Sequence, residues 1–224
     1  MLELSNGANM EEEIKKEEIA SYIKAHIDSA ILSKDRITAE PRYHHSTSYD
    51  MAPSIIKYGF LSAIAQQENG ITVYSDDIVK RVLMDDFHVN GNNGISFAVM
   101  NLKDLYRDEF EFDPMLPTGV DFIVDIPWRL VRNTENYGNE FISDLAVDSK
   151  YIRYLDLRIK RLLIEELRDD NHDEIIARYN NIIRICRAIK KYNNGIILRE
   201  LSDDKKLYLD YDKIRDYPKI KIKK

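Results

Sequence analysis

Two histidines stand beside small hydroxyl residues early in the chain, in the segment 43–47, which reads Tyr-His-His-Ser-Thr. An imidazole on a strand can hydrogen-bond a ribose hydroxyl, and the backbone beside a small side chain can reach a flat amide group. Much later, Glu140 comes after the apolar strand segment that contains Phe122, Ile123 and Val124. A fixed carboxylate stabilises the positive charge that develops on a sugar when its glycosidic bond breaks. These residue types therefore predict binding and cleavage at a ribose.

Three further residues suit the same chemistry. Tyr106 follows the segment 94–98, which reads Gly-Ile-Ser-Phe-Ala. An aromatic ring binds a flat cationic ring by stacking and by cation–π attraction. Ser96 is a small residue inside that segment, and Arg42 directly precedes the histidine segment. Arginine pairs well with phosphate oxygens, so Arg42 is a candidate phosphate contact.

The residues of these segments and their order along the chain resemble the ADP-ribosyltransferase superfamily, and most closely its poly(ADP-ribose) polymerase-like branch. The segment 43–47 resembles the family's aromatic-His-Gly-Thr strand, with Ser46 in place of glycine. The segment 94–98 resembles a Gly-Ile-Tyr-Phe-Ala strand, with Ser96 in place of tyrosine. The segment 139–142, Asn-Glu-Phe-Ile, resembles the family's Asn-Glu-Tyr-Ile. The resemblance covers roughly residues 41–155.

The resemblance implies a substrate, NAD, and a role for each matching residue. Glu140 and His45 are the implied catalytic residues, and His44 is the outward neighbour of His45. No metal is implied. The residues implied to bind NAD are His45, Ser46, Thr47, Ser96, Tyr106 and Arg42. This interpretation requires that the imidazole at 45 and the carboxyl at 140 meet across a single cleft.

Alternatives remain for the carboxylate and for the activity. Glu200 also ends a predicted strand, but the wording and spacing around Glu140 fit better. Gly138 stands where the arginine-modifying branch has a second glutamate, so that specificity is not supported. The departures at Ser46 and Ser96 keep open a non-catalytic module that binds NAD or ADP-ribose. An RNA phosphotransferase on the same fold is a third reading, and it would need several pocket arginines.

Composition limits the possible partners. The chain has 224 residues, 32% of them charged, and a formal net charge of −6. That charge argues against a broadly basic nucleic-acid face, and it favours a protein acceptor over nucleic acid. The sequence shows neither a signal segment nor an apolar run of membrane-spanning length, so we expect a cytoplasmic protein in a bacterium or phage-infected cell, with export by another route left open. A role as toxin, effector or phage-defence protein is suggested only by analogy with the family.

The single cysteine, Cys186, excludes an intrachain disulfide and falls on the apolar side of a helical pattern. Neither His44 nor His45 has partners at metal-ligand spacing, so no metal site is expected. The basic tail 219–224 is expected to be a solvated end or an edge strand. The role of the C-terminal part and the oligomeric state stay open.

Periodicity predicts the remaining elements. Asp50 is expected to cap a helix that Gly59 closes in a left-handed turn. The predicted helices are 11–32, 51–58, one around 77–84, 101–107 and two after residue 155. The predicted strands are 42–47, 94–99, 120–126, 141–147, 196–198 and 206–211.

The pattern as a whole predicts an α+β protein. By resemblance, its fold is an ADP-ribosyltransferase-like split, mainly antiparallel sheet with an N-terminal helix and a C-terminal helical extension. The expected organisation is an N-terminal helical segment over 1–40, the ADP-ribosyltransferase-like core over 41–155, and a helical hairpin with short strands over 156–224, packed on the core.

Overall fold

The computed structural model describes residues 11–36, 43–62, 65, 70, 95–99, 119–130, 132–133, 140–143, 146–202 and 205–223. The α-helices are α1 (Ile19–Ser29), α2 (Ala52–Tyr58), α6 (Ile159–Arg168), α7 (His172–Tyr192) and α8 (Tyr211–Arg215). The strands are β1 (Glu11–Ile14), β2 (Ile31–Arg36), β3 (Tyr43–Thr47), β4 (Ile95–Val99), β5 (Val120–Val124), β6 (Arg132–Asn133), β7 (Glu140–Ser143), β8 (Ile152–Leu157), β9 (Ile197–Ser202), β10 (Lys205–Leu209) and β11 (Lys219–Ile222). Short 3-10 helices occupy Lys16–Glu18, Trp128–Leu130 and Ser149–Tyr151.

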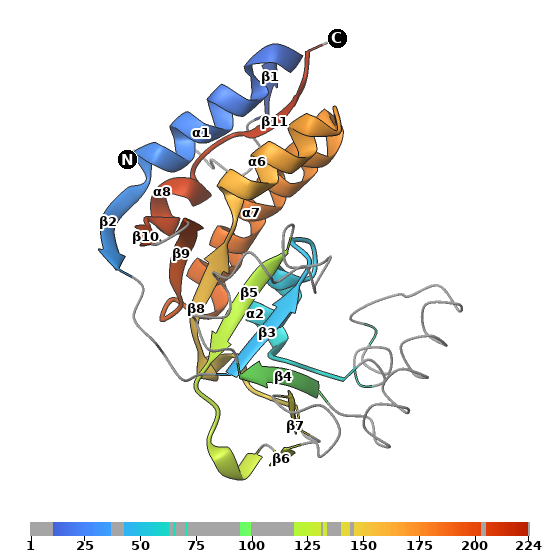
Figure 1. Cartoon of the computed structure of the whole chain (residues 1–224), viewed down its shortest axis with the longest axis vertical. Helices are drawn as coiled ribbons and strands as arrows, with labels where there is room; N and C mark the ends of the chain where they lie inside the picture. Colours follow the sequence, from blue (N-terminus) through green and yellow to red (C-terminus); the bar gives the residue numbers. More distant parts are fainter. Residues whose placement is uncertain are drawn as a thin grey trace, which may run out of the picture.

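One large sheet organises the described chain. Its strand order is β2-β10-β9-β8-β5-β3-β4-β7-β6, and every neighbouring pair is antiparallel except β8 with β9. Figure 1 shows this sheet running through the molecule, with α1, α6 and α7 at one end and β4, β6 and β7 at the other. The predicted α+β class with a mainly antiparallel sheet is therefore confirmed.

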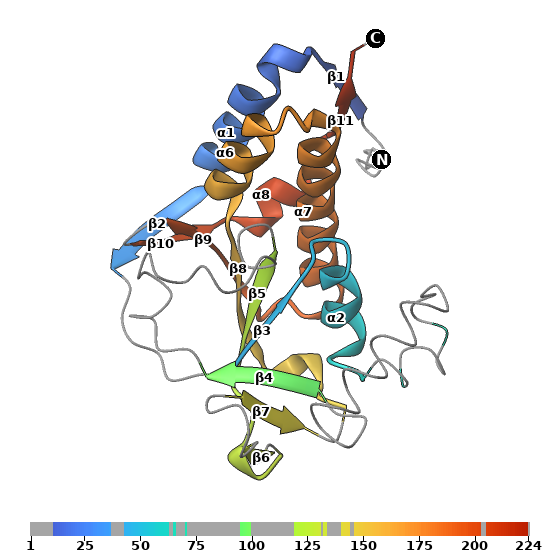
Figure 2. The same ribbon diagram turned by 45° about the vertical axis from the view of Figure 1, so that its right-hand side comes forward.

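Strand β3 shares fewer paired residues with β4 than with β5. Strand β3 pairs with β5 along its whole length, from Tyr43 to Thr47. Among the described residues, β3 pairs with β4 only at Tyr43 with Val99 and at His44 with Ala98. Both views show β4 crossing the end of β3 instead of running beside it (Figures 1 and 2). The two limbs of the sheet therefore meet at one corner, which His44 and Ala98 form.

The N-terminal segment differs from the predicted helix over 11–32. Only Ile19–Ser29 is α-helical, and strands flank it on both sides. Strand β1 pairs in parallel with β11 near the other end of the chain, and Lys221 forms ion pairs with Glu11 and Glu13. The acidic residues therefore pair with a basic strand and do not begin a helix. Strand β2 pairs with β10, so the large sheet continues past the expected core boundaries at 41 and 155.

The C-terminal part contains the two predicted helices and both predicted strands. Helix α7 buries one continuous stripe at helical spacing, including Tyr179, Ile182, Cys186 and Ile189, all of them fully buried. Burying an apolar side chain of this size contributes roughly 1.5–3 kcal/mol. Cys186 is thus a core residue, as predicted, and burial raises the pKa of its thiol. Helix α8 was not predicted, and strand β11 is the edge strand expected as one reading of the tail.

Helix α2 forms close to its predicted bounds, but Asp50 does not cap it. Met51 is the N-cap residue, and no side chain accepts a hydrogen bond from the first turn. Gly59 ends the helix with φ at 80°. The next residue, Phe60, forms a bridge with Val147, which brings the two backbones together. A Cβ at position 59 would lie 2.3 Å from the Val147 carbonyl oxygen.

The predicted helices at 77–84 and 101–107 lie outside the described residues. The predicted strand over 141–147 is represented by β7 over Glu140–Ser143 and by the bridge at Val147. Within the described part of the chain, no helix combines the length and the apolarity needed to cross a membrane.

Gly59→Ala is expected to lower the free energy of unfolding by about 2 kcal/mol or more, because it combines a left-handed backbone with a clash against Val147. Gly195→Ala is the matched control, since a Cβ at position 195 would lie 3.4 Å from its nearest neighbour, the Oδ1 atom of the flexible Asn193 side chain. Urea unfolding of the three proteins measures the difference. Equal midpoints for the two variants would contradict the argument.

Candidate functional site

Polar residues form a row across the middle of the large sheet. The register aligns Ser46 on β3 with Asp121 on β5, and Asp121 with Asp156 on β8. Asp156 is aligned with Arg199 on β9, and Arg199 with Tyr208 on β10. Residues that are directly opposite on neighbouring strands share one face of a sheet. These five residues, the polar row, therefore lie on the same face.

A buried histidine joins the polar row from the same face. His44 precedes Ser46 by two positions, and its ring is almost fully buried. The Nδ1 atom lies 2.9 Å from Asp121 Oδ2, and Ser46 Oγ donates to Asp121 Oδ1 at 3.2 Å. Burial opposes ionisation of Asp121, but the hydrogen bond and charge of His44 hold the pKa of its carboxyl below the ordinary value. Asp121 therefore stays ionised and fixes the orientation of the imidazole.

The second ring nitrogen of His44 has no such contact. Its Nε2 atom is buried and makes no hydrogen bond with any residue that the structure describes. Because Nδ1 faces Asp121, Nε2 is the ring nitrogen left for another partner. A buried polar atom without a partner costs about 1–3 kcal/mol, so a ligand atom that bonds Nε2 would recover that free energy.

The middle of the row is a buried ion pair. Arg199 donates to Asp156 through Nε at 2.5 Å and Nη2 at 2.8 Å, and both side chains are at most 1% exposed. The guanidinium also lies 3.8 Å from the centre of the Tyr154 ring. Two parallel hydrogen bonds and a stacked ring hold the plane of the guanidinium in one orientation.

His45, the predicted catalytic histidine, belongs to the opposite face. It is aligned with Phe122, and the register continues to Leu155 and Leu198. Its ring centre lies 5.0 Å from that of Phe60 and 5.7 Å from that of Phe97. The His45 ring therefore packs among phenylalanines, on the face where the apolar core lies.

The register places Glu140 level with His44 and not with His45. Glu140 is aligned with Ala98 on β4, and Ala98 is aligned with His44 on β3. Two strand spacings put the backbone positions of Glu140 and His44 roughly 10 Å apart. Phe97 and Phe141 occupy the neighbouring row, to which the contact with His45 belongs. The register therefore aligns the backbone of Glu140 with His44, and the meeting of positions 45 and 140 across one cleft stays a prediction.

The remaining predicted residues are placed as follows. Thr47 lines a cavity of about 400 Å³ at the end of β3, together with Tyr49 and with Arg178 and Asn181 of α7. Ser96 lies on β4, two positions from Ala98, and is aligned with Ile142. Arg42 and Tyr106 lie outside the described residues.

The rival carboxylate, Glu200, caps a helix. Its Oε2 accepts from the backbone N–H of Ile159 at 2.9 Å, and its Oε1 accepts from that of Lys160 at 3.0 Å. These are the first two residues of α6, so Glu200 satisfies two N–H groups that a helix leaves without partners. Burial raises the pKa of Glu200 to about 8, against the opposing effect of the two hydrogen bonds. Its contacts give Glu200 a structural role.

Sequence reasoning missed Asp121, Asp156 and Arg199. Asp121 and Asp156 each stand between apolar neighbours in a strand, Arg199 stands between Leu198 and Glu200, and all three are almost fully buried. A charge within an apolar strand is the available signal, because burial of an ion requires a partner. Among the described residues, no group of three or more His, Cys, Asp or Glu side chains is arranged to hold a metal ion.

Comparison with known proteins returned no match: neither a family model, nor a curated protein, nor a solved structure is similar to this chain.

The stability of the protein is expected to depend on pH through Glu200. Because its pKa is raised from 4.5 to about 8, the folded state holds the proton more tightly than the unfolded state. Stability is therefore lost as the pH rises through this window, and Glu200→Gln has no proton to lose. We expect the stability advantage of the wild type over Glu200→Gln to shrink between these pH values in urea unfolding. Glu17→Gln, an exposed change of the same kind, is the control, and parallel pH curves for wild type and Glu200→Gln would refute the expectation.

Proposed function

We propose that the protein is an NAD-dependent ADP-ribosyltransferase, which cleaves the bond between nicotinamide and ribose and transfers ADP-ribose to a macromolecular acceptor. One observation carries the proposal. The three segments that resemble the family lie on adjacent strands, β3, β4 and β7, and the register aligns Glu140 with a histidine on β3. The resemblance in sequence order thus corresponds to neighbouring positions in space.

His44 is the better candidate for the ribose contact. Asp121 holds its Nδ1, so Nε2 is the atom that a ribose hydroxyl would contact. With one proton on the ring, at Nδ1, Nε2 accepts from the hydroxyl; with a second proton, it donates to the hydroxyl oxygen. Because Nε2 is buried, the groups that cover it must move when NAD enters. Asp121 then acts as a positioning residue.

Glu140 supplies the electrostatic step. When the bond between the ribose C1′ and the nicotinamide nitrogen breaks, its electron pair leaves with nicotinamide, and positive charge develops on the sugar. The carboxylate of Glu140 stabilises this charge and accepts the proton that the attacking acceptor loses. Ser46 and Ser96 flank the corner at which β3 and β4 separate, where their backbone groups are candidates to contact the carboxamide. Tyr106 and Arg42 keep the stacking and phosphate roles that the resemblance implies.

The net charge of −6 favours a protein acceptor, and a toxin, effector or phage-defence role in the cytoplasm remains the family analogy. A non-catalytic module that binds NAD or ADP-ribose is the second candidate, because the His44 imidazole is almost fully buried and the His45 ring packs against Phe60 and Phe97. The RNA phosphotransferase is disfavoured, since Arg199, the arginine in the polar row, is already bound to Asp156.

Glu140→Gln is expected to lower transfer of label from NAD by at least about 100-fold, because it removes the charge that stabilises the transition state. The assay incubates purified protein with labelled NAD and a cell lysate, followed by mass spectrometry of the modified material. Glu17→Gln is the control for loss of one carboxylate. Folded wild type that neither transfers label nor hydrolyses NAD refutes the proposal, and calorimetric binding of NAD without consumption supports the module instead.

The two histidines are separated by paired substitutions. His44→Asn is expected to raise the KM for NAD at least about tenfold, because it removes Nε2, whereas His45→Asn is expected to act mainly on stability by disturbing the ring contacts with Phe60 and Phe97. Steady-state NAD hydrolysis and urea unfolding are measured on both variants. A KM effect confined to His45→Asn would restore the histidine originally predicted.

A further inference from the structure

A groove of about 410 Å³ lies between α2 and α7, away from the polar row. Its lining carries four cationic side chains and two tyrosines. These residues are Lys57, Tyr58, Arg184, Arg187, Lys191 and Tyr192, which we call the basic groove. Figure 2 shows α2 alongside the C-terminal half of α7, where these residues lie.

Among the described residues, the lining of the basic groove contains cations and no carboxylates. No acidic side chain lines it, and none of its four cations forms an ion pair with a carboxylate in the described part of the chain. The Arg184 guanidinium donates to the neutral amide of Asn181 at 2.7 Å. Lys57 donates to the Tyr58 hydroxyl, which raises the pKa of the Lys57 ammonium and keeps it charged. On a protein with a net charge of −6, such a cluster is a local positive patch that attracts anions.

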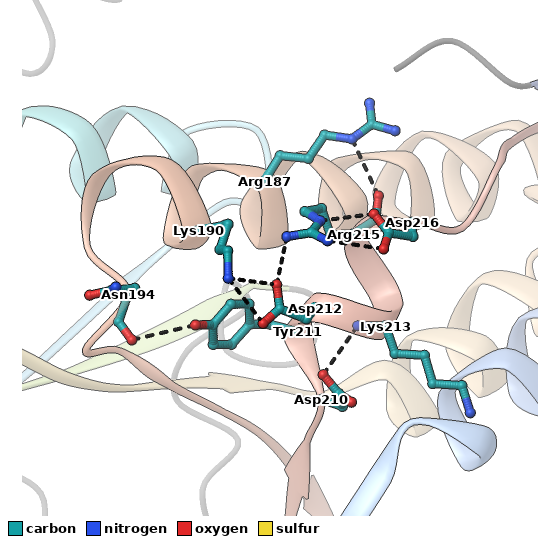
Figure 3. A network of polar contacts seen from close by, with 9 residues as sticks. All are labelled: Arg187, Lys190, Asn194, Asp210, Tyr211, Asp212, Lys213, Arg215 and Asp216. Carbon is teal, nitrogen blue, oxygen red and sulfur yellow. Dashed lines mark hydrogen bonds and ion pairs between the residues drawn. The ribbon is translucent and has the colours of Figure 1, made fainter. Parts of the chain in front are cut away.

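The opposite situation occurs on the neighbouring face of α7, which Figure 3 shows. There Lys190 lies 3.2 Å from Asp212, which also accepts from Arg215 at 2.6 Å. Arg215 forms two further hydrogen bonds with Asp216. Cations on that face are neutralised by α8.

Arg187 stands at the border between the two faces. Its Nε donates to the carbonyl oxygen of Arg215 at 3.4 Å, as Figure 3 shows. Asp216 is near enough for Arg187 to contribute to the lowering of its pKa, but the hydrogen bond from Arg215 is the largest cause. The backbone contact positions the Arg187 side chain beside the groove.

The two tyrosines place aromatic rings among these cations. Tyr58 and Tyr192 are 44% and 42% exposed. Lys57 Nζ lies 4.2 Å from the centre of the Tyr58 ring and 5.7 Å from that of Tyr192. Lys191 Nζ lies 5.1 Å from the Tyr192 ring. A nucleotide base can stack on an exposed aromatic ring while its phosphate pairs with a neighbouring cation, so this arrangement suits a nucleotide.

We propose that the basic groove binds single-stranded nucleic acid. Arg184, Arg187 and Lys191 recur one helical turn apart and cover about 10 Å of the helix, enough for neighbouring phosphates. Tyr58 and Tyr192 offer surfaces on which unpaired bases stack, and stacking requires a strand whose bases are free. An acidic peptide would bind the cations but would have no base to stack on the two tyrosine rings. Binding here is independent of the transferase activity proposed above.

Fluorescence anisotropy with labelled twelve-nucleotide oligo(dT) and oligo(U) tests the proposal on the full-length protein. Four phosphate contacts give a slope of log K against log salt of about −3, at roughly 0.7 for each contact. Arg184→Gln combined with Lys191→Gln should reduce that slope by roughly 1.4. Tyr192→Ala should weaken binding about fivefold or more, whereas Tyr192→Phe keeps the ring and the affinity.

Lys24→Gln combined with Arg168→Gln is the matched control, because it removes one lysine and one arginine from exposed ion pairs elsewhere. It should leave oligonucleotide binding unchanged. Absence of binding at low salt overturns the proposal. An equal loss of oligonucleotide binding in the control variant also overturns it. If polyglutamate competes as well as unlabelled oligonucleotide, the groove is a site for acidic peptides and the proposal is wrong.

Discussion

The buried ion pair between Arg199 and Asp156 constrains the whole sheet. Such a pair contributes little net stability, but separating its members leaves an uncompensated buried charge, which costs about 3–5 kcal/mol. A slip of one residue between β8 and β9 would move one of the two charges to the face that carries Leu155 and Leu198. The buried ion pair on one face and the buried leucines on the other therefore favour a single register between β8 and β9. Asp121 and Ser46 extend that constraint across β5 to β3.

This register determines where the candidate site is built. Strand β3 is fixed along its length by β5, but β4 meets it only at the corner of His44 and Ala98. The limb that carries Glu140 is therefore positioned through that corner. Glu200 provides a second anchor, because it lies on the apolar face and binds the first two N–H groups of α6. Helix α6 is thus hydrogen-bonded to Glu200 on the apolar face of β9, and the polar row lies on the opposite face.

Local patterns in the sequence predicted most individual elements but not their long-range pairing. The apolar runs of β5 and α7 and the glycine after α2 are signals contained within a few residues, and they predicted the elements correctly. The acidic residues Glu11–Glu13 suited a helix start equally well, because their partner strand, β11, lies near the other end of the chain. The choice between His44 and His45 depends on strand parity, which a short polar strand without clear alternation does not reveal. The structure separates the two side chains by face, since His44 contacts the carboxylate of Asp121 and the His45 ring packs against Phe60 and Phe97.

The local arrangement of charges on this protein indicates where an anion can bind better than the net charge does. The net charge of −6 is an average, and many surface cations are already held by neighbouring carboxylates, as Lys190 is by Asp212. A cation held in an ion pair must lose its carboxylate before it can neutralise a phosphate, so it adds less to the release of counterions from a polyanion. The cations of the basic groove form no ion pair with a carboxylate among the described residues, so they are available to contact phosphates. Long-range repulsion from the acidic surface is screened within about 8 Å at physiological ionic strength. At contact distance the groove, and not the net charge, therefore decides which polymer can bind.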